Sequence, residues 1–341
     1  MVRARPVDRR QFLSHAGSAL ALPAASALLP TGLAAQTATG GAATGAGTFD
    51  SWRQLGDLTR RAVDMGISVP RMSAHIDTAG GRDFQQIMPA AVELLRSLER
   101  PTQIKPVAPG ELARLVDEAD DLLRKVHQAE RNLPDERGEG LSITATPGRP
   151  SYDSIKASYR QLFETAKVRE ANRSSLEWYM SQLINAENQK RWYSVAQAAC
   201  CPWYFVGIIH AMEASFNFRS HLHNGDSLKA RTFQVPAGRP KTWNPPNDWE
   251  TSAVDALLFD GFVDVSDWSL ERTLYRWEAY NGFRSRGNGI NTPYLWSFSN
   301  HYAKGKFVAD NVWDPNAVSK QCGAAVMLRV LLDRQLIQIP A

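Results

Sequence analysis

The 341-residue chain has only three cysteines, Cys200, Cys201 and Cys322. Three cysteines are too few for a small fold stapled by disulfides. One bridge from Cys322 to Cys200 or Cys201 and three buried free thiols are both compatible with the sequence. Beyond the first 35 residues the chain also lacks an apolar run long enough for a membrane-spanning helix, so we expect no stable span.

The chain carries little net charge once its first 35 residues are set apart. The whole sequence has a formal charge of +4 at pH 7, and residues 1–35, with four Arg and one Asp, supply +3 of it, which leaves +1 for the rest. No cluster of Lys and Arg follows that would track a phosphate backbone. The composition therefore argues against a nucleic-acid partner.

The first 35 residues have the composition of an export leader. Paired arginines, Arg9-Arg10, lie in the run Asp8–Leu13, which resembles the twin-arginine consensus of bacterial export signals. A short apolar stretch from Ala16 to Leu29 comes next, and small residues near Ala34-Ala35 offer a cleavage point. We expect a twin-arginine signal and a mature protein that is periplasmic or secreted.

The remaining chain divides by composition into two linkers and two helical regions. Gly and Ala dominate residues 36–48, and Gly, Pro and polar residues dominate residues 136–150, so both are predicted linkers. Residues 49–135 form a helical N-terminal region of unknown role, in which apolar residues recur at helical spacing over Asp83–Glu99 and Pro109–Leu133. Residues 151–341 form the second region.

The second region is predicted to be mainly α, with one small β excursion. Its expected helices cover 152–199, 204–218, 249–259 behind Asp248 as N-cap, 268–280 and 315–336. The one expected strand is Thr232–Val235, which Pro236 ends.

Glu213 is the most informative residue of the predicted helix 204–218. On a helical projection it lies at the edge of an apolar arc that includes Ile209, Met212 and Phe216. A carboxyl group in apolar surroundings is poorly solvated and holds its proton more tightly than in water. Such a group is suited to act as a general acid that protonates a leaving oxygen. The alternative is an ordinary glutamate paired with a nearby base.

A polar loop follows this helix and carries a second acid. It reads His221-Leu222-His223-Asn224-Gly225-Asp226. Two carboxyl groups on opposite walls of a cleft can share glycoside cleavage, with one protonating the glycosidic oxygen and the other holding a water. Asp226 is the candidate second carboxylate. Its alternative role is that of a turn residue, since Asn-Gly-Asp is strong turn chemistry, and both roles are open.

Two later segments carry groups that suit a sugar chain. They are Ala279-Tyr280-Asn281-Gly282 and Pro293-Tyr294-Leu295-Trp296. Aromatic faces pack against the CH faces of a sugar ring, and nearby polar groups bind its hydroxyls. The candidate substrate-binding residues are Tyr280, Asn281, His223, Asn224, Tyr294 and Trp296.

Together these motifs resemble the lysozyme-like superfamily of peptidoglycan hydrolases, in particular bacterial lysozyme-family proteins and lytic transglycosylase-like domains. The resemblance rests on Ile209–Phe216, His221–Asp226 and Ala279–Gly282. It implies a lysozyme-like domain over residues 151–341, with Glu213 as the catalytic acid and with Tyr280 and Asn281 lining the glycan site. The chain departs from the transglycosylase pattern at Ala214, where Ser is usual, and it lacks a Gly-Leu-Met-Gln motif after the acid.

The resemblance implies an enzyme that cleaves a β-1,4-linked aminosugar polymer, foremost peptidoglycan, without a cofactor, and the leader predicts that this enzyme is exported. Hydrolysis with Asp226 placing a water and internal attack that forms an anhydro sugar are both open. Another class is a metal-dependent hydrolase that uses His210, Glu213, His221 and His223. Two further alternatives are a catalytic Cys201 thiol activated by His210 and a non-catalytic wall-binding protein.

Overall fold

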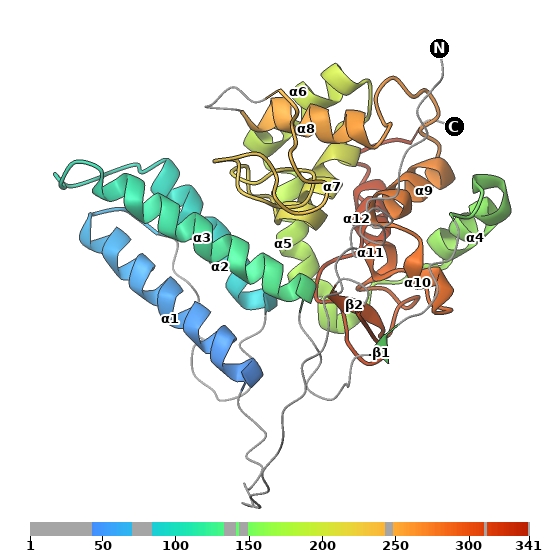
Figure 1. Ribbon diagram of the computed structural model, residues 1–341, viewed down its shortest axis with the longest axis horizontal. Helices are drawn as coiled ribbons and strands as arrows, with labels where there is room; N and C mark the ends of the chain where they lie inside the picture. Colours follow the sequence, from blue (N-terminus) through green and yellow to red (C-terminus); the bar gives the residue numbers. More distant parts are fainter. Residues whose placement is uncertain are drawn as a thin grey trace, which may run out of the picture.

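The computed structural model describes residues 43–69, 84–132, 141–142, 149–242, 248–309 and 312–339. The predicted twin-arginine leader and the start of the first predicted linker lie outside these ranges. Within them the chain is mainly helical and has one small antiparallel sheet, as the sequence predicts for its class. Figure 1 shows three long helices on one side and the shorter helices with the sheet on the other.

The N-terminal region consists of three helices with their own apolar core. They are α1 (Ala43–Asp64), α2 (Phe84–Glu99) and α3 (Glu111–Asn132). The predicted helices Asp83–Glu99 and Pro109–Leu133 are confirmed as α2 and α3, whereas α1 begins inside the predicted linker 36–48. The apolar stripes of the three helices meet, and each Leu that they bury contributes about 1.5–3 kcal/mol. The core includes Leu55, Leu58, Leu94, Leu95, Leu98, Leu115, Leu122 and Leu123.

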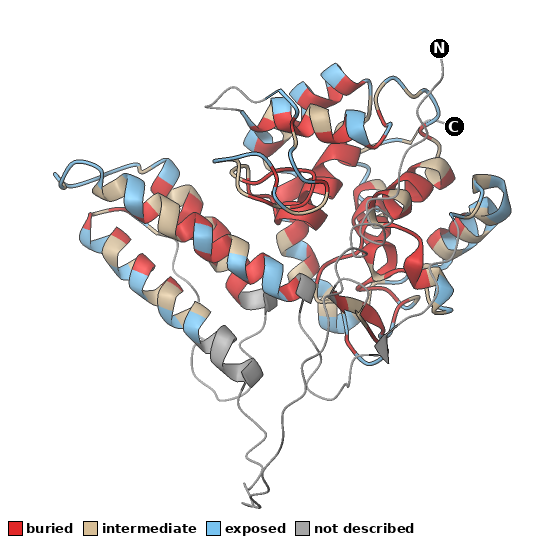
Figure 2. Cartoon of the chain, viewed as in Figure 1, coloured by how far each residue is buried: buried red, intermediate tan, exposed pale blue. Residues whose placement is uncertain are grey.

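The C-terminal region is an assembly of shorter helices around a second, larger core. Figure 2 shows how completely its central helix α7 is buried. The predicted N-cap is confirmed, because Asp248 Oδ1 accepts from the backbone NH of Thr251 at 2.6 Å. The helices are α4 (Tyr152–Thr165), α5 (Arg173–Leu183), α6 (Ala186–Ala199), α7 (Trp203–Ala214), α8 (Trp249–Phe259), α9 (Leu270–Asn281), α10 (Arg284–Gly287), α11 (Pro293–Trp296) and α12 (Ala324–Asp333).

The predicted strand Thr232–Val235 is wrong, and the sheet lies elsewhere. The backbone NH groups of Phe233 and Gln234 each donate to Asp226 Oδ2 at 2.9 Å, so a side chain and not a neighbouring strand satisfies them. The sheet has the order β1-β3-β2 and joins β1 (Leu141–Ser142), β3 (Val312–Asp314) and β2 (Lys306–Ala309) in antiparallel register. The strand β1 falls inside the predicted linker 136–150.

In the described part of the chain, no single helix is long and apolar enough to cross a membrane. The helices α6 and α7 reach the required length and composition only as a pair, and that pair is bent by 115°.

Candidate functional site

Helix α7 carries Glu213 in its last turn. Its sequence is almost wholly apolar, and every residue from Tyr204 to Ala214 is buried. The helix ends where Ser215 (φ 47°) and Phe216 (φ 63°) take left-handed backbone conformations. Two consecutive non-glycine residues in this region are strained and need support from their surroundings. The predicted helix 204–218 therefore ends four residues early, and only Ala214 separates Glu213 from the turn.

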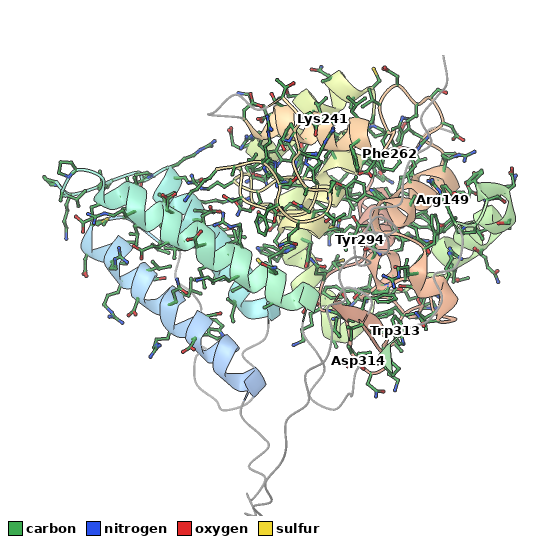
Figure 3. All side chains as sticks on the ribbon, viewed as in Figure 1. Arg149, Lys241, Phe262, Tyr294, Trp313 and Asp314 are labelled. Atoms are coloured by element: carbon green, nitrogen blue, oxygen red, sulfur yellow. The ribbon has the colours of Figure 1, made fainter. Side chains whose placement is uncertain are left out.

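The carboxyl group of Glu213 contacts a residue that lies 81 positions later in the chain. The hydroxyl of Tyr294 donates to Glu213 Oε1 at 3.2 Å, and Glu213 is only 1% exposed. Tyr294 is held by the start of α11, where the Thr292 side chain accepts from the Tyr294 NH and Pro293 takes the first helical position. Figure 3 places Tyr294 centrally within the C-terminal region.

Tyr294 also lines a pocket, together with one other residue that the sequence predicted for glycan binding, Asn281. Both polar and apolar side chains line the pocket, and none of the described lining residues carries a carboxylate. Gln321 connects the pocket lining to α7, because its Nε2 donates a hydrogen bond to the carbonyl of Met212 at 3.2 Å. The lining residues are Met212, Asn281, Ser285, Pro293, Tyr294, Lys306, Phe307, Ser319 and Gln321.

The polar loop 221–226 packs directly against the end of α7. Gly225 has a φ of 79°, and a Cβ built on it would lie 2.5 Å from the carbonyl oxygen of Glu213. Only glycine allows both this backbone conformation and this approach. The structure thus brings together the helix end and the loop that the sequence singled out.

Gly225→Ala is expected to destabilise the protein by about 2–3 kcal/mol, because the new methyl group meets backbone and the residue is forced to keep a positive φ. The measurement is the free energy of unfolding in denaturant, with Gly238→Ala as the control. Gly238 also has a positive φ, of 73°, but nothing lies within 4 Å of its Cβ position. Equal losses in both variants would show that the close approach to Glu213 adds nothing.

Asp226 is buried (4% exposed) and is directed toward its own loop. Its Oδ2 accepts from the Asn224 side-chain amide and from the NH groups of Phe233 and Gln234, each at 2.9 Å. Three donors on one oxygen hold the segment 224–234 together. These contacts favour the role of a turn residue, and Asp226 does not line the pocket beside Tyr294. Water placement by Asp226 stays a prediction.

The two histidines of the loop are buried and hydrogen-bonded within the fold. His221 Nε2 donates to the carbonyl of Ala230 at 2.7 Å, and its Nδ1 shares a 2.6 Å hydrogen bond with Ser252. His223 Nε2 donates to Asp255 Oδ2 at 2.8 Å. Burial raises the pKa of Asp255, but His223 and Arg239 outweigh it and hold that pKa below its usual range.

His210, His221 and His223 therefore have separate partners, since His210 Nδ1 accepts from Trp192 Nε1 at 3.2 Å. Among the residues that the structure describes, no three His, Cys, Asp or Glu side chains come together as a metal-binding group. The metal-dependent alternative thus has no geometric support there.

His210 is fully buried, and burial lowers its pKa to about 3. An unfolded histidine binds a proton below about pH 6.5, whereas His210 in the fold does not. Its neutral form therefore supports the fold fully above pH 6.5, and this support declines as the pH falls toward 3. We expect this effect to lower the free energy of unfolding by about 2 kcal/mol as the pH falls from 6.5 to 5. Unfolding curves at both pH values measure this, and an unchanged pH slope in His210→Gln would contradict it.

Four of the predicted substrate-binding residues are not among those that line the pocket. Tyr280 is 1% exposed and its hydroxyl donates to the carbonyl of Leu222 at 2.7 Å. Trp296 is 1% exposed and belongs to the core. His223 and Asn224 hold the polar loop, as described above. Of the six, the structure places only Asn281 and Tyr294 at the pocket.

Beside Ser285 of α10, three more described polar residues of the pocket wall were missed by sequence reasoning: Lys306, Ser319 and Gln321. Lys306 comes from β2, and the other two come from the turn before α12. The predicted helix 315–336 covered Ser319 and Gln321, so they had no reason to be singled out. Their position depends on contacts between distant segments, which local periodicity does not report.

The cysteines are all free thiols in the structure. Burial raises the pKa of Cys201 to about 12, which is the opposite of what an activated nucleophile needs. The pairing of Cys201 with His210 as a catalytic thiol is thus not supported, because His210 is engaged with Trp192.

Comparison of the chain with protein-family models, with curated proteins and with solved structures finds no match.

Proposed function

We propose that this protein is a lysozyme-like enzyme that cleaves a β-1,4-linked aminosugar polymer, with peptidoglycan as its substrate and Glu213 as its general acid. The observation that carries the proposal is the hydrogen bond from Tyr294 to Glu213, which connects a buried acid to a pocket that also contains Asn281. A general acid held among apolar groups beside a pocket with polar and aromatic walls suits glycoside cleavage.

In the proposed reaction, Glu213 gives its proton to the glycosidic oxygen, and the bond between this oxygen and the anomeric carbon breaks. This anomeric carbon belongs to a muramoyl residue, whose own C6 hydroxyl then attacks it. The proton of that hydroxyl passes to the Glu213 carboxylate. The product is an anhydro sugar. The commitment of Asp226 Oδ2 to three donors of its own loop favours this outcome over hydrolysis.

The test is digestion of purified peptidoglycan by the wild-type protein, with the products identified by mass. Anhydro products support the proposal in full, and products heavier by one water keep Glu213 but replace the internal attack by hydrolysis. Cleavage of chitin in preference to peptidoglycan would change the substrate and keep the mechanism. Binding to peptidoglycan without any turnover would overturn the enzymatic proposal in favour of a wall-binding protein.

Export through the twin-arginine route is part of the same proposal. It would carry the folded enzyme to the compartment in which peptidoglycan lies. The paired arginines Arg9-Arg10 and the apolar stretch behind them support it.

A further inference from the structure

Helix α3 carries two different faces. Its apolar face packs into the N-terminal core through residues such as Leu115, Leu122 and Val126. The other face is polar, and its residues recur at spacings of three and four, so they lie along one side of the helix. They are Asp117, Asp120, Arg124, His127 and Glu130. Asp120, His127 and Glu130 are buried, so this face is not an ordinary solvated surface.

The polar face of α3 contacts Ser215 and Asn217, which lie two and four residues after Glu213. His127 Nδ1 shares a 2.6 Å hydrogen bond with Ser215 Oγ. The side-chain amide of Asn217 donates to Asp120 Oδ1 at 2.8 Å. These contacts fall on the turn where the backbone leaves α7, and Ser215 is one of the two strained residues there.

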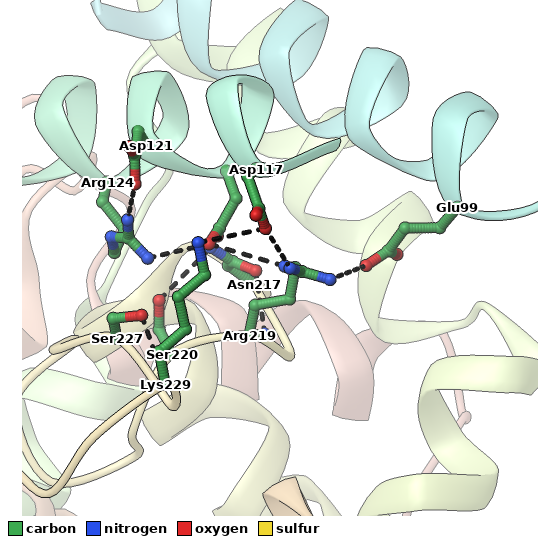
Figure 4. Close-up of polar contacts among 10 residues, drawn as sticks. Glu99, Asp117, Asp121, Arg124, Asn217, Arg219, Ser220, Ser227 and Lys229 are labelled. Atoms are coloured by element: carbon green, nitrogen blue, oxygen red, sulfur yellow. Dashed lines mark hydrogen bonds and ion pairs between the residues drawn. The ribbon is translucent and has the colours of Figure 1, made fainter. Parts of the chain in front are cut away.

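A second set of contacts extends this interface to Arg219 and Lys229, on either side of the polar loop 221–226. Arg219 Nη2 lies 2.8 Å from Asp117 Oδ1, and Lys229 Nζ lies 3.0 Å from the same oxygen. Arg219 also reaches Glu99 of α2 at 3.5 Å. Figure 4 shows Asn217, Arg219 and Lys229 converging on this side of α3.

The far end of α3 reaches the wall of the pocket. Figure 1 shows this end beside β2. Glu130 is 2% exposed, and its Oε1 accepts from the backbone NH of Lys320 at 2.7 Å and lies 3.4 Å from Lys306 Nζ. Lys306 lines the pocket, and Lys320 lies between the lining residues Ser319 and Gln321. One helix of the N-terminal region thus contacts both the turn that follows α7 and the part of the pocket wall that contains Lys306.

Burying polar groups costs free energy even when they are paired. Apolar side chains would hold two regions together without that cost, so the polar contacts indicate a requirement for defined geometry. A strained helix end persists only where its surroundings fix it. A carboxyl group displaced by about 1 Å loses much of its catalytic effect.

We propose that α3 is a positioning element of the cleavage site, in which His127 and Asp120 hold the turn that follows Glu213. This inference rests on the proposed function. It gives the N-terminal region a role, namely to complete the site that the C-terminal region carries. His127 is a positioning residue, because it acts on the acid through Ser215.

The test compares His127→Leu, which removes the hydrogen bond and fills the space with an apolar side chain, with His127→Asn, whose amide can occupy the place of Nδ1. We expect kcat on peptidoglycan to fall about tenfold in His127→Leu, with KM within twofold of wild type. His127→Asn is expected to recover kcat to within about threefold. Ser215→Ala should match His127→Leu, and the double variant should lose no more than either single one.

The matched control is Glu118→Gln on the same helix, because Glu118 pairs with Arg61 inside the N-terminal region. Its kcat is expected to stay at the wild-type value. Unfolding temperatures of all variants are measured beside the kinetics, and Ser215→Ala keeps the test decisive should His127→Leu not fold.

Wild-type kcat in both His127→Leu and Ser215→Ala would overturn the inference and leave the proposed function standing. So would a loss in His127→Asn equal to that in His127→Leu, because the hydrogen bond would then not be the cause. If the wild-type protein fails to cleave glycan, or Glu213→Gln cleaves as well as wild type, the proposed function fails and the inference fails with it.

Discussion

Glu213→Gln is expected to lower the rate of peptidoglycan cleavage about a thousandfold while the protein stays folded. General acid catalysis contributes roughly 10²–10⁴ in rate, and an amide cannot supply the proton. The substitution keeps the size of the side chain, and its carbonyl oxygen can still accept from the Tyr294 hydroxyl, which lies 3.2 Å from Glu213 in the wild type. The measurement is the rate of release of soluble fragments, beside the unfolding temperature of both proteins.

The control is Glu271→Gln. Glu271 is also buried (8% exposed), but it lies on α9 and pairs with Arg160, away from the residues that line the pocket. We expect its cleavage rate to equal that of the wild type. A Glu213→Gln variant as active as Glu271→Gln would remove Glu213 from the mechanism. A Glu213→Gln variant that has unfolded would leave Tyr294→Phe and Asn281→Ala as the variants with which to probe the pocket.

Helices with a one-sided apolar stripe were predictable from the sequence, and the end of α7 was not. Helices α2, α3 and α8 lie where the spacing of their apolar residues and the cap at Asp248 placed them. No Gly or Pro marks the end of α7, and Ser215 and Phe216 take the left-handed conformation that glycine usually takes. The contacts that support this turn come from α3, which lies about 90 residues earlier. Local sequence does not contain that information.

The candidate site was predictable as a set of residues and not as an arrangement. Glu213, Asn281 and Tyr294 were each singled out by type and context. The structure places Asn281 and Tyr294 at one pocket, and Glu213 is connected to it through the hydrogen bond from Tyr294. His221 and His223 were also singled out by type and context, because a loop so rich in polar residues is usually exposed and able to bind a ligand. Their burial depends on Ser252 and Asp255 of α8, each of which engages one ring nitrogen. Which polar residues face a ligand and which face a partner is decided by tertiary contacts.

Asp226→Ala is expected to destabilise the protein by about 3–5 kcal/mol. The substitution removes the acceptor for the Asn224 side chain and for the NH groups of Phe233 and Gln234. Each buried donor left without an acceptor costs about 1–3 kcal/mol. Asp226→Asn keeps one oxygen where Oδ2 lies, so it is expected to cost about 1 kcal/mol. Unfolding in denaturant measures both values.

The same pair of variants decides the chemical role of Asp226. An Asn side chain can hold the loop, but it cannot act as a base toward water. If Asp226 only holds the loop, Asp226→Asn retains peptidoglycan cleavage to within about threefold and gives the same products as the wild type. We expect this result, because the acceptor oxygen is already engaged by three donors. A stable Asp226→Asn variant that has lost cleavage would instead make Asp226 the second carboxylate of a hydrolase.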